Sequence, residues 1–213
     1  MKDSEPYPDV AGVSLVNASP TATNLDFYLD NAKVNVNPMS YMAALNYFNA
    51  IIGSRTATVK SSATSQELLT EKIPFAVNKY YSVFVTGTEP LSYLVTKDSL
   101  YAPSADKALV RFINLSPDSG PLQLASSPKA AINESVVTTT LFSNIAYKAY
   151  TEYHQVDPGK FLISIKDQAT GADKATLPDV EILSGKIYTI YAKGLNAATV
   201  ADYKLGIRVM RYN

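Results

Sequence analysis

The chain has 213 residues, and its 19 basic and 19 acidic side chains give a formal net charge of zero. A nucleic-acid binder needs a basic face that displaces phosphate counterions, so we expect no nucleic-acid partner. The sequence contains no Cys, which excludes disulfides, thiolate zinc sites and cysteine nucleophiles. No apolar run is long enough to span a membrane as a helix.

Residues 1–10 are polar and contain two prolines, and we interpret them as an extended leader. A first strand is expected from Ala11 to Asn17, and it ends in Asn17-Ala18-Ser19-Pro20. The same kind of strand end returns at 114–117, as Asn-Leu-Ser-Pro, 97 residues later (117 − 20). The repeat indicates two copies of one β-rich domain.

Alternating apolar and polar runs between turn residues predict the other strands. They lie at 25–29, 55–60, 67–75 and 79–87 in the first half and at 160–166, 175–183 and 186–194 in the second. Residues 39–52 fit either a helical face or a strand. The related segment 147–153 alternates more clearly, so we predict strands for both.

We divide the chain into the leader 1–10, a first domain 11–104 and a second domain 105–213, with about seven strands each. The offset between the copies grows from 97 to 107 residues along the repeat, as the pairing of Gly87 with Gly194 shows (194 − 87). The second copy therefore carries about ten extra residues, which we place between Ser126 and Thr140.

Alternation also predicts which side chains form the cores. In the first domain these are Tyr81, Val83 and Val85, and in the second Tyr188, Ile190 and Ala192. Ser82 and Thr189 then occupy the opposite faces. Near the C-terminus, one strand face should carry Leu205, Ile207 and Val209.

These motifs together resemble the DUF4397 family, whose pattern joins an Asn-x-Ser-Pro strand end to a later Gly-x-x-Tyr-Thr strand. In the second copy the matching residues are Val110, Arg111, Phe112, Asn114, Ser116, Pro117, Asp118, Asn144, Tyr147, Pro158, Gly159, Gly185, Tyr188, Thr189 and Gly194. In the first they are Asn17, Ala18, Ser19, Pro20, Gly53, Tyr81 and Gly87. The first copy departs from the pattern at Thr21, where Asp is usual, and at Asn78, where Gly is common.

The resemblance implies an all-β chain of two tandem immunoglobulin-like antiparallel β-sandwich domains and an extracytoplasmic location, and it brings no catalytic residues. Within such a fold, Tyr81 and Tyr188 have the placement of a tyrosine corner, whose hydroxyl bonds to nearby backbone. The alternative is a core Tyr whose hydroxyl reaches solvent.

His154 is the only histidine, with Glu152 and Asp157 nearby in sequence. A Ser-His-Asp site would also need a serine such as Ser143 or Ser164. No Gly-x-Ser-x-Gly nucleophile motif is present, so we interpret His154 as a surface residue beside a hairpin turn.

Acidic residues occur in two groups, which consist of Asp26 and Asp30 and of Asp173, Asp179 and Glu181. Calcium takes six to eight oxygen ligands, and no EF-hand loop is present. A loop calcium site stays open as an alternative to solvated acids. The 15 tyrosines could form a sugar-stacking surface.

We therefore predict no catalytic, cofactor-binding or metal-binding residues, no cofactor and no enzyme activity. The expected function is adhesion to, or binding of, an unknown surface ligand, either a glycan or a protein. The alternatives are a structural spacer that presents another module and a hydrolase.

The leader resembles the tether that follows the lipidated Cys of bacterial lipoproteins. We therefore expect a cell-envelope or extracellular protein, a lipoprotein with a lipid anchor on a removed N-terminal Cys and a signal peptide missing from this sequence. A cytosolic protein with a frayed N-terminus is the alternative.

Overall fold

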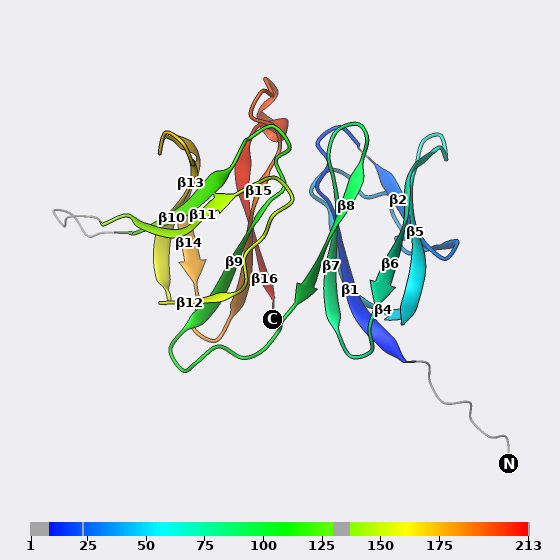
Figure 1. Ribbon diagram of the computed structural model, residues 1–213, viewed down its shortest axis with the longest axis horizontal. Helices are drawn as coiled ribbons and strands as arrows, with labels where there is room; N and C mark the ends of the chain where they lie inside the picture. The colour runs from blue at the N-terminus through cyan, green and yellow to red at the C-terminus, as the bar shows by residue number, and fades with distance from the viewer. Residues whose placement is uncertain (1–8, 23, 130–136, 213) are drawn as a thin grey trace, which may run out of the picture. The chain divides into compact units, whose positions relative to one another are not determined.

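The computed structural model describes residues 9–22, 24–129 and 137–212. The chain forms two compact units, Met1–Ser99 and Leu100–Asn213. In the described residues, each unit consists of eight strands in two four-stranded sheets (Figure 1). The predicted all-β class and β-sandwich architecture are confirmed, with eight strands in each unit where about seven were expected.

Each predicted run of the first unit contains a strand, and two further strands, at 32–33 and 92–98, were not predicted. The strands of this unit are β1 (Val10–Asn17), β2 (Leu25–Leu29), β3 (Ala32–Lys33), β4 (Ala44–Ile51), β5 (Gly53–Ser61), β6 (Glu67–Phe75), β7 (Tyr80–Thr86) and β8 (Ser92–Asp98). One sheet has the order β4-β1-β7-β8 and the other the order β3-β2-β5-β6.

The second unit repeats this arrangement. Its strands are β9 (Ala108–Asn114), β10 (Leu122–Pro128), β11 (Thr139–Ile145), β12 (His154–Val156), β13 (Gly159–Asp167), β14 (Asp173–Ile182), β15 (Ile187–Lys193) and β16 (Gly206–Tyr212). The sheet orders β12-β9-β15-β16 and β11-β10-β13-β14 match those of the first unit strand for strand. One 3₁₀ turn, Ala201–Tyr203, precedes β16.

One strand pair in each unit is parallel, which the sequence pattern did not predict. The first strand lies parallel to the seventh, as β1 with β7 and β9 with β15, and the other pairs within the sheets are antiparallel. A parallel pair needs a long crossover connection. The chain provides it because all four strands of the opposite sheet lie in sequence between the two parallel strands.

The core of each unit lies between its two sheets. Val13, Phe27 and Val59 are among the buried residues of the first core, and Phe112, Leu124 and Ile165 among those of the second. The predicted core faces are confirmed in both units. These residues are Tyr81, Val83 and Val85 in the first unit and Tyr188, Ile190, Ala192, Leu205, Ile207 and Val209 in the second.

The Asn-x-Ser-Pro strand ends have a structural role, because each Asn side chain joins the two sheets of its unit. Asn17 Nδ2 donates to the carbonyl of Met39 at 3.0 Å, and Met39 bridges to the start of β2. Asn114 Nδ2 donates at 3.1 Å to the carbonyl of Ile145, the last residue of β11. Both Asn residues are buried, so their hydrogen bonds replace water that the side chains lose on folding.

Of the two roles considered for Tyr81 and Tyr188, the structure shows the tyrosine corner in both units. The hydroxyl of Tyr188 accepts a hydrogen bond from the backbone N–H of Leu183 at 2.9 Å. The hydroxyl of Tyr81 accepts one from the backbone N–H of Ala76 at 3.2 Å. Each bond fixes the turn that leads into β7 or β15.

The prediction of a strand at 147–153 is wrong, although the related segment of the first unit is strand β4. Tyr147 and Lys148 form a turn, and regular pairing begins only at His154. The hydroxyl of Thr151 accepts a hydrogen bond from the backbone N–H of Phe112 at 3.0 Å. The backbone N–H of Thr151 donates in turn to the carbonyl of Phe112. A side chain thus takes the place of a backbone acceptor in the ladder.

The described part of the chain contains no helix with the length and hydropathy of a transmembrane span.

Candidate functional site

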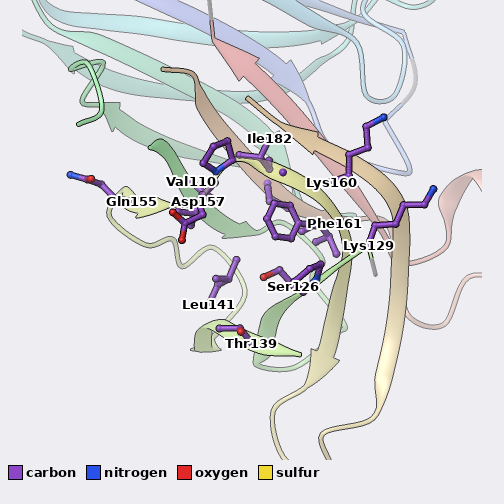
Figure 2. A pocket seen from close by; sticks show the side chains of 16 residues that line it. Val110, Ser126, Lys129, Thr139, Leu141, Gln155, Asp157, Lys160, Phe161 and Ile182 are labelled. Carbon is purple, nitrogen blue, oxygen red and sulfur yellow. The ribbon is translucent and has the colours of Figure 1, made fainter. Parts of the chain in front are cut away.

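A pocket of about 610 Å³ opens between the two sheets of the second unit. It draws on both sheets and on the turn between β12 and β13, so residues far apart in sequence meet there (Figure 2). Its volume lies within the roughly 300–1,000 Å³ range of small-molecule sites. The lining residues are Val110, Ser126, Pro128, Lys129, Thr139, Leu141, Gln155, Val156, Asp157, Pro158, Gly159, Lys160, Phe161, Ile163, Ile182 and Ile190.

The floor of the pocket is part of the apolar core. Val110, Ile163, Ile182 and Ile190 line it, and all four are buried members of the second core cluster. Alternation along β13 turns Ile163 to this side together with Phe161. The apolar surface that a ligand could still cover therefore belongs to the partly buried Leu141, Val156 and Phe161 of the lining.

Few polar groups reach the pocket. Figure 2 shows the hydroxyl of Ser126, from β10, directed into the space that Leu141 and Phe161 border. That hydroxyl makes no hydrogen bond to another described residue. At the margin, Gln155 Nε2 donates to the hydroxyl of Ser104 at 2.8 Å. Ser126 is thus the polar group that a ligand could contact over the apolar floor.

Each charged side chain of the pocket has a partner of opposite charge. Lys129 pairs with Asp179, and Lys160 Nζ lies 4.0 Å from Glu181 Oε1. Lys107 Nζ lies 2.6 Å from Asp157 Oδ1. The hydrogen bond from Lys129 lowers the pKa of the Asp179 carboxyl, and the charges of Lys129 and Lys160 add to this effect. The rim therefore presents paired, solvent-exposed charges.

The first unit has a larger side chain where the second has Ser126. Leu29 pairs with Ala57 on β5, as Ser126 pairs with Ile163 on β13. Leu29 packs against the first core. The connections after these two strands also differ in length. Residues 30–31 connect β2 to β3, and residues 129–138 connect β10 to β11. Most of the extra residues predicted between Ser126 and Thr140 lie outside the described residues.

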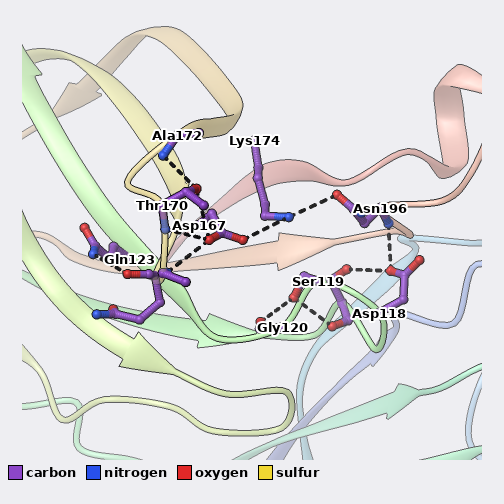
Figure 3. Close-up of polar contacts among 12 residues, drawn as sticks. Asp118, Ser119, Gly120, Gln123, Asp167, Thr170, Ala172, Lys174 and Asn196 are labelled. Atoms are coloured by element: carbon purple, nitrogen blue, oxygen red, sulfur yellow. Dashed lines mark hydrogen bonds and ion pairs between the residues drawn. The ribbon is translucent and has the colours of Figure 1, made fainter.

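A second polar cluster lies at the loop end of the second unit, beyond the end of β9 (Figure 3). Asp118 accepts the backbone N–H of Asn196 at 2.7 Å and that of Ala197 at 2.9 Å. Lys174 donates to Asn196 Oδ1 at 3.4 Å and lies 3.3 Å from Asp167 Oδ2. The polar groups of this cluster thus have one another as bonding partners, and their bonds hold three loops of the second unit together.

The structure does not bring the considered hydrolase residues together. His154 lies on β12 in one sheet, whereas Ser143 and Ser164 lie on β11 and β13 in the other. The exposed His154 makes an edge-on contact with the ring of Phe142 at 5.1 Å. Asp157, the third member of the considered set, is paired with Lys107.

The acidic residues considered for calcium each pair with a basic residue. The pairs are Asp26 with Lys33, Asp30 with Arg55, Asp173 with Lys166, Asp179 with Lys129 and Glu181 with Lys160. Across residues 9–22, 24–129 and 137–212, no group of three or more His, Cys, Asp or Glu side chains is placed to hold a metal ion. These carboxylates therefore serve ion pairs in the structure.

The exposed tyrosines lie on separate segments. Tyr80 is on β7, Tyr101 precedes β9 and Tyr150 precedes β12. Tyr80 contacts the ring of Tyr47 edge-on at 5.2 Å. No ring contact joins Tyr101 to Tyr150 within the described residues. Whether these rings form the sugar-stacking surface considered from the sequence stays a prediction.

The family model described as "Domain of unknown function (DUF4397)" matches residues 11–125, more than half of the chain. The chain belongs to the DUF4397 family. The match begins in β1, covers the remaining strands of the first unit and continues to β10 of the second. Both Asn-x-Ser-Pro strand ends fall inside it.

Two solved structures are similar to this chain, each at 10% sequence identity. One is a family 26 carbohydrate-binding module from Eubacterium rectale Amy13K in complex with maltoheptaose. It has a TM-score of 0.30, with 94% of this chain and 96% of that one covered. The other is a leucine-rich repeat protein from Bacteroides thetaiotaomicron, with a TM-score of 0.24 and coverage of 93% and 26%. No curated protein matches the chain.

Sequence reasoning missed the pocket of this DUF4397 protein. One signal that could have indicated it is that the extra residues were predicted between Ser126 and Thr140, a range whose described ends line the pocket. A second signal was Ser126 itself, because it stands at a core-facing position where the first unit has Leu29.

Proposed function

We propose that this chain is a non-enzymatic ligand-binding protein and that its second unit binds a small molecule in the pocket between its sheets. The observation that carries the proposal is the pocket itself, about 610 Å³ in volume, with a floor of buried aliphatic side chains and an inward-pointing hydroxyl. A concave pocket of this size, with an apolar lining and a few polar groups, is typical of small-molecule sites and supports occupation by a ligand.

The proposal includes that both units are copies of the DUF4397 domain. Their identical strand orders, their two tyrosine corners and their two sheet-joining Asn residues support it. On this view the first copy keeps the fold with its core filled at Leu29, and the second has become the binding copy.

We also propose that the protein works outside the cytoplasm, held by a lipid anchor. The support is the family resemblance and the polar, proline-containing leader. Expression of the complete native gene in its own host, with labelled fatty acid, tests this. A labelled protein in the membrane fraction is expected, and an unlabelled protein in the cytosol would contradict it.

The binding proposal is tested by NMR. Amide resonances of the full chain are recorded with a library of small molecules, glycans and peptides, alongside the variant Ser126→Leu, which places the side chain of the first unit in the pocket. We expect at least one ligand to shift resonances of pocket residues such as Ile163, and Ser126→Leu to remove those shifts. If no compound does so, or if the variant binds equally well, the chain is not a pocket binder and the spacer function takes precedence.

A hydrolase function has its own test. Generic ester, peptide and glycoside substrates are incubated with the full chain and with the variant His154→Gln. We expect no turnover above that of buffer. Turnover that disappears in the variant would contradict the non-enzymatic proposal.

A further inference from the structure

We propose that the pocket selects an uncharged, mainly apolar molecule that carries one hydroxyl or carbonyl group, and that this group bonds to the Ser126 hydroxyl. This inference rests on the proposed binding function and specifies its ligand class. It differs from the glycan or protein partner that the sequence suggested.

The first step is the apolar surface that the ligand must cover. Val110, Ile163 and Ile190 at the floor are buried, whereas Leu141, Val156 and Phe161 in the lining are only partly buried and keep apolar surface in contact with water; Leu141 and Phe161 are labelled in Figure 2. Removal of apolar area from water is favourable in proportion to that area. An aliphatic or aromatic ligand body therefore gains most from this surface.

The second step concerns polar groups of the ligand. A hydroxyl moved from water into an apolar site costs free energy unless it finds a hydrogen-bond partner. Over the floor, Ser126 offers one hydroxyl, while Thr139 and Gln155 lie at the margin. A sugar ring carries several hydroxyls and would leave most of them without partners. A ligand with a single hydrogen-bonding group matches the single inward hydroxyl.

The third step concerns charge. An anionic ligand would need an unpaired cation, but Lys129 and Lys160 already pair with Asp179 and Glu181. These pairs are solvent-exposed, with side-chain exposures of 55–62%, and they lie at the rim and not over the floor. A carboxylate beside Ser126 would lose its hydration without gaining an ion pair. The site therefore favours a neutral group over a charged one.

The experiment compares three ligand classes on the full chain. N-phenyl-1-naphthylamine, a fluorophore that brightens in apolar surroundings, reports occupation of the pocket. Its displacement is then tested separately with 1-octanol, with octanoate at neutral pH and with linear oligosaccharides. Octanol and octanoate have the same chain length and differ in the charge of the head group, so their comparison isolates the effect of charge.

We expect 1-octanol to displace the fluorophore at a concentration at least about tenfold lower than octanoate, and oligosaccharides not to displace it. Ser126→Ala, which keeps the space and removes the hydroxyl, should weaken octanol binding by about three- to tenfold, the value of one ordinary hydrogen bond. Ser126→Leu should abolish it. Ser164→Ala is the matched control, because Ser164 lies on the neighbouring strand between the core residues Ile163 and Ile165 and so faces away from the pocket.

The outcomes separate the ligand class from the binding function. Octanoate binding as tight as octanol, oligosaccharide binding that Ser126→Leu removes, or unchanged octanol affinity in Ser126→Ala would overturn the ligand class and leave the binding function standing. Binding of no class, or equal binding by Ser126→Leu, would overturn both. If Ser126→Leu does not give folded protein, Ser126→Val fills the pocket with a smaller side chain and gives the same readout.

Discussion

Replacing tyrosine by phenylalanine should have opposite effects at two buried positions of this protein. The hydroxyl of Tyr188 accepts the backbone N–H of Leu183 at 2.9 Å. The hydroxyl of Tyr93 is buried in the first unit and has no hydrogen-bond partner among the described residues. Burial raises the pKa of the Tyr93 phenol well above its ordinary value, with smaller contributions from Glu71 and Glu67. The same chemical change therefore removes a hydrogen-bonded hydroxyl at Tyr188 and a hydroxyl without a hydrogen bond at Tyr93.

The magnitudes follow from the partners that are left behind. Tyr188→Phe leaves the half-buried Leu183 N–H without its acceptor, which should destabilise the second unit by about 1–2 kcal/mol. Tyr93→Phe removes a buried hydroxyl that is not hydrogen-bonded and keeps the ring and its edge-on contact with Phe27. It should leave the first unit equally stable or more stable by up to about 1 kcal/mol.

Hydrogen exchange of core amides in the native state measures both effects, because it reports on each unit separately where a single unfolding curve would not. Tyr81→Phe is the intermediate case, since the Ala76 N–H that it releases is exposed and can bond to water. We expect a loss below about 0.5 kcal/mol there. A Tyr93→Phe variant less stable than the native protein, or a Tyr188→Phe variant indistinguishable from it, would refute the reasoning.

Three further predictions concern the second unit. Ile190→Ala should cost about 2–5 kcal/mol in the free energy of unfolding, because Ile190 is completely buried, and the half-buried Ile207→Ala should cost less; a loss below about 0.5 kcal/mol would contradict the assigned core face. His154→Gln should change stability by no more than about 0.5 kcal/mol in urea unfolding, since His154 is exposed. The Thr170 backbone N–H, followed by the Lys174 side chain, lowers the pKa of Asp167 below its ordinary 3.8. The ionised form is therefore favoured in the folded state, so its stabilisation is full above pH 3.8 and is lost as the pH falls through the lowered pKa. Unfolding of Asp167→Asn between about pH 2 and 5 should show a weaker acid dependence than that of the native protein, and equal slopes would disprove the assignment.

The sequence alone determined most strands of the first unit and the inner faces of β7 and β15. Along β7 and β15, side chains alternate with a period of two, and a shift by one residue would turn every apolar side chain to the wrong face. That constraint is local, so it placed Val83 and Ile190 correctly. The two Asn-x-Ser-Pro ends were recognisable for the same reason, because each motif lies within a few residues.

The tertiary structure alone decided which strands are neighbours and where the pocket lies. The parallel pairing of β1 with β7 joins segments about 70 residues apart, and neither strand carries a local sign of its partner. In the sequence, Ser126 looks like any other polar residue of a strand. Its hydroxyl faces a pocket only because the strands of the opposite sheet enclose that space. Tyr147 to Tyr153 alternate as a strand would, but the Thr151 hydroxyl takes the N–H of Phe112 and the ladder stays irregular. In each case the deciding energy comes from contacts between distant segments, which a local pattern does not contain.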